Sequence, residues 1–255
     1  MTGPLLLGHR GHRLAQAWSR GARKRRPDVV VEPENSRPAF QRALDAGCDG
    51  VELDLRLSAD RHVVLLHDPR LGARAVSRLT LAELRRRQPA VATLAEVLND
   101  LRQRAWLDLE VKARRGVEEP LVAALRRWPP LRGYVVSSFH PGVLRRLAAL
   151  APGIPLCLNL AAAVPILRLR RLPLTWVAPA ARVARPKYLR RLHAEGWKTL
   201  VWTVNRPRRM RDLAAAGVSA LVSDDPYLLA ATLGKGHAAP PGSGGRWPEA
   251  SGPVR

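Results

Sequence analysis

The stretch VELD at residues 51–54 decides the fold of this chain, together with its counterpart LEVK at residues 109–112. In both, charged side chains alternate with apolar ones near the end of a short apolar run. Side chains two positions apart on a β-strand share a face, so Glu52 and Asp54 project together. Reactive groups at the carboxyl ends of parallel strands are typical of an α/β barrel, and this pattern therefore predicts one.

Short β-type runs alternate with helical segments along most of the chain, as in parallel α/β folds. Eight strands at this spacing predict a closed (β/α)8 TIM barrel in a single domain. No glycine-rich dinucleotide fingerprint follows the first strand to favour an open sheet. The segment 62–67 is interpreted as an extra extended piece outside the barrel. The expected strands are 4–9, 49–55, 105–111, 133–138, 154–160, 174–178, 198–204 and 218–223, and the expected helices are 36–46, 80–86, 93–103, 117–127, 141–150, 161–170, 186–195, 206–215 and 226–232.

Two segments depart from this alternation. Residues 12–32 form a long, strongly basic stretch, which we expect to be a loop on the barrel rim. Residues 234–255 are rich in Gly, Pro and Ser without an apolar period, and are expected to be a disordered tail. The barrel domain is accordingly assigned to residues 1–233.

The chain of 255 residues carries 43 Lys and Arg against 21 Asp and Glu, a formal net charge of +22. The basic residues are spread over several predicted helices, so we interpret them as a compositional bias rather than a nucleic-acid surface. Such a field still favours anionic substrates and acidic membranes. The two cysteines lie in apolar segments, and neither a signal peptide nor a membrane-spanning run is evident, which predicts a soluble, cytoplasmic protein.

Three carboxylates are candidates for a metal site: Glu52, Asp54 and Glu110. Each stands at or near the end of a predicted strand, and carboxylate oxygens suit a hard cation such as Mg²⁺ or Ca²⁺. The alternative is that each acid pairs with one of the many arginines. The set of three beside two histidines favours one divalent metal ion.

His9 and His67 follow different strands, so they could flank a bound ester from opposite sides. Histidine is the usual general acid or base near neutral pH. Arg10 and Lys112 supply cations suited to phosphate oxygens. Metal, cations and a paired acid and base together predict cleavage of a phosphodiester.

Six motifs in order resemble the glycerophosphodiester phosphodiesterase family, over about residues 5 to 230. They are His9-Arg10-Gly11, Pro33-Glu34-Asn35-Ser36, Val51-Glu52-Leu53-Asp54, His67-Asp68, Leu109-Glu110-Val111-Lys112 and Trp202-Thr203-Val204-Asn205.

The resemblance implies a TIM barrel that hydrolyses glycerophosphodiesters to glycerol 3-phosphate and an alcohol with a divalent metal. By motif, it makes His9 and His67 the acid–base pair, Glu52, Asp54 and Glu110 the metal ligands, and Arg10 and Lys112 the phosphate contacts. Glu34 would support the metal or Arg10. Trp202 would line the site for glycerol or the alcohol, although barrel packing explains it nearly as well, and Phe139 stands in a family-like Ser-Ser-Phe turn.

Two departures from the family are notable. The loop 12–32 is longer than usual and could lengthen the substrate groove, contact anionic membranes, or simply be tolerated on the surface. The stretch between His67 and Thr93 is too short for the helical insertion domain of some relatives, so we expect an open site.

The sequence thus predicts a cytoplasmic enzyme for small glycerophosphodiesters, without a nucleic-acid partner. Two alternatives remain at this point. One is a lysophospholipase D that uses the basic loop at membranes. The other is a non-catalytic basic barrel that binds nucleic acid or acidic lipid, against which the intact set of polar residues argues.

Overall fold

The computed structural model describes residues 3–12 and 32–234. Most of the predicted basic loop and nearly all of the predicted tail therefore lie outside the described residues. Within them, eight parallel strands form a closed barrel, because β1 pairs with both β2 and β11. These strands are β1 (Leu5–His9), β2 (Gly50–Leu57), β6 (Trp106–Val111), β7 (Tyr134–Ser138), β8 (Leu156–Leu160), β9 (Trp176–Pro179), β10 (Lys198–Val201) and β11 (Ala220–Ser223).

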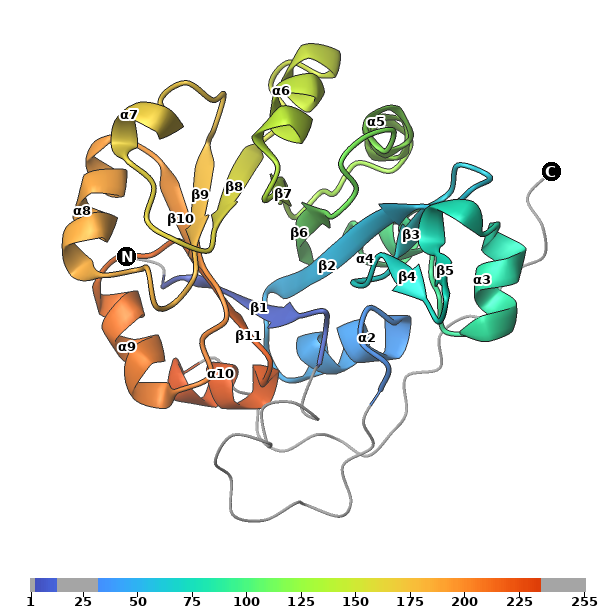
Figure 1. Cartoon of the computed structure of the whole chain (residues 1–255). Coiled ribbons are helices and arrows are strands. Elements are labelled where there is room, and N and C mark those ends of the chain that lie inside the picture. Colours follow the sequence, from blue (N-terminus) through green and yellow to red (C-terminus); the bar gives the residue numbers. More distant parts are fainter. Residues whose placement is uncertain (1–2, 13–31, 235–255) are drawn as a thin grey trace.

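Helices surround the strands as a ring (Figure 1). They are α2 (Arg37–Asp45), α4 (Leu94–Leu101), α5 (Glu118–Arg127), α6 (Pro141–Leu150), α7 (Ile166–Leu169), α8 (Pro186–Ala194), α9 (Pro207–Ala215) and α10 (Pro226–Thr232). The predicted TIM barrel is therefore confirmed. The largest apolar cluster packs the outward faces of the strands against these helices.

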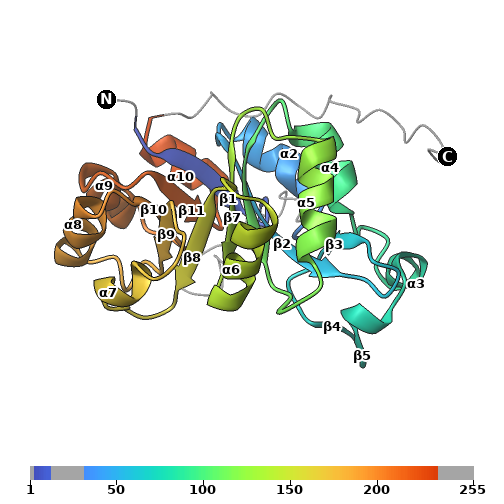
Figure 2. The same ribbon diagram turned by 90° about the horizontal axis from the view of Figure 1, so that it is seen from above.

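The segment between β2 and β6 holds small additions and no large insertion. β3 (Val63–Leu65) pairs antiparallel with the end of β2, which confirms an extended piece outside the barrel. The short hairpin of β4 (Arg70–Leu71) and β5 (Arg74–Ala75) follows, then the 3-10 turn η2 (Val76–Arg78) and α3 (Leu81–Arg87). Figure 2 shows these elements together at one side of the barrel.

Local signals explain where several elements begin and end. Ser36 caps α2 by accepting a hydrogen bond from the backbone of Ala39, and Thr80 forms a capping box with Glu83 at the start of α3. The expected helix 161–170 is reduced to α7, because Pro165 disfavours helical backbone at the residue before it. No helix of the described residues is long and apolar enough to cross a membrane.

Inside the barrel, inward-facing side chains change from apolar to acidic along the strands. Leu7, Trp106 and Trp176 belong to an apolar cluster in the interior, in which the two indole rings lie 5.4 Å apart. One step further along β2 and β6, Glu52 is level with Asp108, and after the next step Asp54 is level with Glu110. Large apolar side chains thus close the barrel interior toward the amino ends of the strands, and carboxylates line it toward the carboxyl ends.

Candidate active site

The register of two neighbouring parallel strands brings the predicted acids together. Asp54 of β2 aligns with Glu110 of β6, and Glu52 lies two residues before Asp54 on the same face. All three are buried, and one carboxylate oxygen from each lies within 4.8 Å of the others.

Both predicted cations contact these acids. Nε of the Arg10 guanidinium lies 2.9 Å from Asp54 Oδ2. The backbone N–H of Arg10 donates to Glu52 Oε2 at 3.0 Å. Lys112 Nζ lies 3.1 Å from Asp54 Oδ1 and 2.6 Å from Glu110 Oε1. Among the described residues, the alternative in which each acid pairs with an arginine therefore holds for Asp54, whereas Glu110 pairs with a lysine.

Charge and burial act differently on the three carboxyl groups. Burial raises the pKa of Glu52 well above its ordinary range, and the neighbouring Asp54 and Glu110 raise it further. Burial also raises the pKa of Glu110, although Lys112 opposes the effect. Burial would raise the pKa of Asp54 too, but Lys112 and Arg10 outweigh it and lower that pKa. The site is short of positive charge at Glu52 and Glu110.

Each candidate histidine has an aspartate of its own. His9 Nδ1 lies 2.5 Å from Asp224 Oδ1, which leaves Nε2 on the side of Glu52, 3.8 Å from Oε2. His67 Nδ1 lies 2.7 Å from Asp68 Oδ1. An acceptor at Nδ1 fixes the ring and leaves Nε2 to exchange protons.

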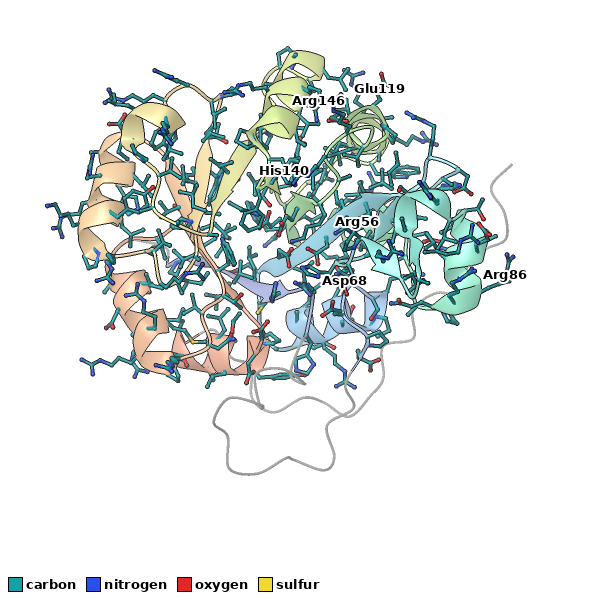
Figure 3. The ribbon with its side chains drawn as sticks, in the orientation of Figure 1. Arg56, Asp68, Arg86, Glu119, His140 and Arg146 are labelled. Carbon is teal, nitrogen blue, oxygen red and sulfur yellow. The ribbon has the colours of Figure 1, made fainter. Side chains whose placement is uncertain are left out.

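His67 is held from a second side as well. The guanidinium of Arg56 donates to the backbone carbonyl of His67 through Nε at 2.9 Å. Arg56 and Asp68 are labelled in Figure 3, where both lie next to β2 at the barrel mouth. Burial lowers the pKa of His67, and Arg10 and Lys112 add to this against the pull of Asp54. The lowered pKa favours the neutral imidazole, although the hydrogen bond to Asp68 also opposes the shift.

Glu34 and Trp202 are also at the site. Glu34 Oε1 lies 2.9 Å from Arg10 Nη1, so Glu34 forms an ion pair with Arg10. Trp202 donates its indole N–H to the carbonyl of Ala178 at 2.7 Å and meets Phe139 edge to face, with ring centroids 5.4 Å apart. Phe139 in turn lies 5.6 Å from Lys112 Nζ, at cation–π distance.

Further polar residues at the site were not assigned a role from the sequence. Asn35, named from the sequence only as part of the motif at residues 33–36, donates to Asp54 Oδ2 at 2.9 Å and accepts from the Asp54 backbone N–H at 3.0 Å. Asp224 directly follows the last strand, so the strand-end rule that selected Glu110 could have found it. It also accepts from Asn205 Nδ2 at 2.6 Å. Asp108 lies one layer deeper, where it accepts from Ser137 Oγ at 2.6 Å.

The acids fit a divalent cation. Glu52 Oε1 is buried without a hydrogen-bond partner among the described residues, and a buried carboxylate oxygen is costly in that state. Among the described residues, Arg10 and Lys112 are the permanent cations within ion-pair distance of these three carboxylates, two positive charges against three formal negative ones. Glu52, Asp54 and Glu110 are the residues that could hold the ion, with the all-oxygen ligands that Mg²⁺ and Ca²⁺ prefer.

The sequence model of the glycerophosphoryl diester phosphodiesterase family matches residues 20–228. The chain belongs to this family. It is therefore an enzyme of the phosphoric diester hydrolase class. The predicted family resemblance is confirmed.

Several known members of the family are similar to the chain over most of its length. A glycerophosphodiester phosphodiesterase of Caldanaerobacter subterraneus is 28% identical over 83% of this chain and 96% of its own, and one of Bacillus altitudinis is 26% identical over 76% and 90%. Among solved structures, the glycerophosphodiester phosphodiesterase of Thermotoga maritima superposes with a TM-score of 0.74 at 22% identity, over 91% of this chain and 99% of that one. A phosphodiesterase of Oleispira antarctica, solved with the product sn-glycerol-3-phosphate, gives 0.75 at 24% identity, over 91% and 97%. The structural likeness supports the barrel fold.

Proposed function

We propose that this enzyme hydrolyses small glycerophosphodiesters to glycerol 3-phosphate and an alcohol, with one Mg²⁺ or Ca²⁺ ion and a pair of histidines. The observation that carries the proposal is the meeting of three buried carboxylates, two cations and two aspartate-bound histidines at one barrel mouth. The product bound to the Oleispira antarctica phosphodiesterase supports the choice of substrate.

Glu52, Asp54 and Glu110 would hold the metal, which would polarise the phosphate and lower the pKa of a bound hydroxyl. Arg10 and Lys112 contact these acids and can also reach phosphate oxygens, so that they neutralise charge that builds up on the phosphate during attack.

The histidines divide the proton transfers. The lowered pKa of His67 favours its neutral form, which accepts the proton of the attacking hydroxyl. If that hydroxyl is water, glycerol 3-phosphate forms directly. If it belongs to the glycerol part of the substrate, a cyclic phosphate forms first, and water then opens it to glycerol 3-phosphate with the two histidines in reversed roles. His9 protonates the departing alcohol from Nε2, while Asp224 holds Nδ1. On the direct route, His67 returns its proton to solvent after product release and His9 takes one up.

A substrate panel tests the proposal. Glycerophosphocholine, glycerophosphoethanolamine and lysophosphatidylcholine would be assayed with and without a chelator, following release of choline or ethanolamine from all three and of glycerol 3-phosphate from the two deacylated diesters. We expect release from the first two and its loss with the chelator. Equal turnover in the chelator would refute the metal, and turnover of lysophosphatidylcholine alone would refute the substrate class.

The cytoplasmic location expected from the sequence remains part of this proposal. Cys48 and Cys157 are both buried as free thiols, in agreement with a reducing compartment.

A further inference from the structure

A cavity of about 440 Å³ lies beside the barrel mouth and takes no part in the proton transfers described above. Residues of β8 and the segments after β7 and β8 line it. Its volume is in the range of sites that hold small ligands. The residues that matter here are Phe139, Asn159, Arg145, Arg168 and Arg171.

Phe139 connects this cavity to the active site. Its ring forms part of the cavity wall and also lies 5.6 Å from Lys112 Nζ, which is bound to Asp54 and Glu110. A phosphate diester held at Lys112 would therefore have one of its two alcohol groups next to the cavity. The edge-to-face contact with Trp202 fixes the ring between the two spaces.

Asn159 brings an unused amide to the cavity. It lies on β8 level with Ala178 of β9, is only 7% exposed, and lines the cavity. Its Oδ1 is buried without a hydrogen-bond partner among the described residues. A buried amide in this state is destabilising unless a ligand completes it, and a hydroxyl group can do so because it both donates and accepts.

Three arginines give the cavity an anion-binding rim. Arg145 lies on α6, Arg168 on α7, and Arg171 just beyond α7; none of the three guanidinium groups forms a hydrogen bond or ion pair with another described residue. By contrast, the neighbouring Arg170 is paired with Glu195 at 2.6 Å. No carboxylate of residues 3–12 or 32–234 lines the cavity, so these residues leave the charge of the three guanidiniums uncompensated there.

We propose that this cavity binds the alcohol part of the diester, and that the preferred alcohol is hydroxylated and carries a second phosphate group. The inference rests on the proposed function and names its substrate class: glycerol 3-phosphate esterified to a polyol phosphate. The polyol hydroxyl would meet Asn159 and the second phosphate the arginine rim. An acyl chain could also pack against the apolar part of the cavity wall. It would leave the Asn159 amide and the three guanidinium groups without partners.

The test compares two charge-matched triple variants on two diesters. R145Q/R168Q/R171Q removes the rim, whereas R126Q/R190Q/R211Q removes three exposed arginines on the outer helices α5, α8 and α9. The substrates are glycerophosphoglycerol phosphate, which has the second phosphate, and glycerophosphocholine, which has a cationic alcohol. We expect the rim variant to lose about tenfold or more in kcat/KM on the first, mainly through KM, and under about twofold on the second.

Asn159→Ala gives a second, independent measurement. It should weaken turnover of glycerophosphoglycerol, which has hydroxyls, more than that of glycerophosphocholine, whose choline has none. Thermal melting of every variant checks that the barrel is intact.

The outcomes are distinct. An equal loss on both substrates, no loss, or a similar loss in the control triple variant would overturn the inference while leaving the proposed function in place. A wild-type preference for lysophosphatidylcholine would overturn it in favour of an acyl occupant. If the wild type cleaves no glycerophosphodiester, the proposed function fails and the inference with it.

Discussion

At the scale of single residues, the position of each histidine depends on one aspartate. Asp224 fixes His9 through Nδ1. The Asn205 amide in turn donates to the Asp224 carboxylate and accepts from the Asp224 backbone N–H.

Alanine in place of His9 or His67 removes a proton-transfer group. We expect kcat to fall about 10³-fold in either variant, with an unchanged melting temperature. Wild-type turnover in either would contradict the assignment.

Asp224→Asn should have a smaller effect of a different kind. The amide keeps the shape of the side chain but removes the charge that orients the imidazole. We expect kcat to fall about 10- to 100-fold with little change in KM, and the pH profile of kcat to shift. Asp212→Asn, an exposed residue on α9, is the matched control. An unshifted pH profile would mean that Asp224 does not act through His9.

Asp108 is predicted to make stability depend on pH. Burial raises the pKa of Asp108 from an ordinary 3.8 to about 7, against the hydrogen bond from Ser137. Between these values the folded protein keeps a proton that the unfolded chain releases, so stability falls as pH rises. The slope from this residue is up to about 1.4 kcal/mol per pH unit.

Asp108→Asn keeps the acceptor for Ser137 without the ionisable group. Urea unfolding in chelator from pH 4 to pH 8 should show a shallower decline in the variant than in the wild type. Glu52 and Glu110 contribute a decline of the same sign to both proteins, so the difference reports Asp108 together with its electrostatic effect on Glu52. Parallel curves would show that Asp108 is not buried as a neutral acid.

At the scale of elements, the sequence was sufficient for the order of strands and helices and for part of the site. Alternation of apolar and charged residues marked β2 and β6, and the strand-end rule then selected Glu52, Asp54 and Glu110. It could not reveal which partners those acids have, because contacts such as His9 with Asp224 join residues 215 positions apart. Nor could local pattern show that Asn35, next to a helix cap, turns to Asp54, since its left-handed backbone (φ 57°) is a property of the folded loop.

The alignment of β2 with β6 depends on Gly50. Gly50 is level with Trp106, and a Cβ atom there would lie 1.8 Å from the Trp106 carbonyl oxygen. Gly50→Ala should therefore separate the two strands and cost about 3 kcal/mol in unfolding free energy, with a loss of activity because Asp54 and Glu110 move apart. The measurements are urea unfolding and kcat.

Gly142→Ala is the matched control for Gly50→Ala. Gly142 lies in the first turn of α6, where a Cβ atom meets only the end of the Arg146 side chain, at 3.4 Å. Alanine favours helix over glycine, so this variant should be neutral or slightly more stable. Equal stability of the two variants would show that the contact of β2 with β6 tolerates a side chain at position 50.

At the scale of the whole molecule, the chain is strongly basic while its active site is short of positive charge. The net charge is +22, yet the pKa values of Glu52 and Glu110 are raised, first by burial and then by the neighbouring acids. Composition therefore did not predict the local field, and the outer arginines do not neutralise the interior. The buried carboxylates of the barrel lack compensating positive charge, which a divalent cation would supply.

A bound ion should consequently stabilise the entire barrel. A ligand that binds only the folded state at about 100 times its Kd adds about 2.7 kcal/mol. For a domain of this size that corresponds to a rise of roughly 5–10 °C in melting temperature. Calorimetry with Mg²⁺ or Ca²⁺ against chelator measures the effect. Glu52→Gln should abolish it, whereas Glu119→Gln, at an exposed position on the outer helix α5 (Figure 3), should retain it. An equal rise in both variants would place the ion elsewhere, because only Glu52 belongs to the carboxylate cluster.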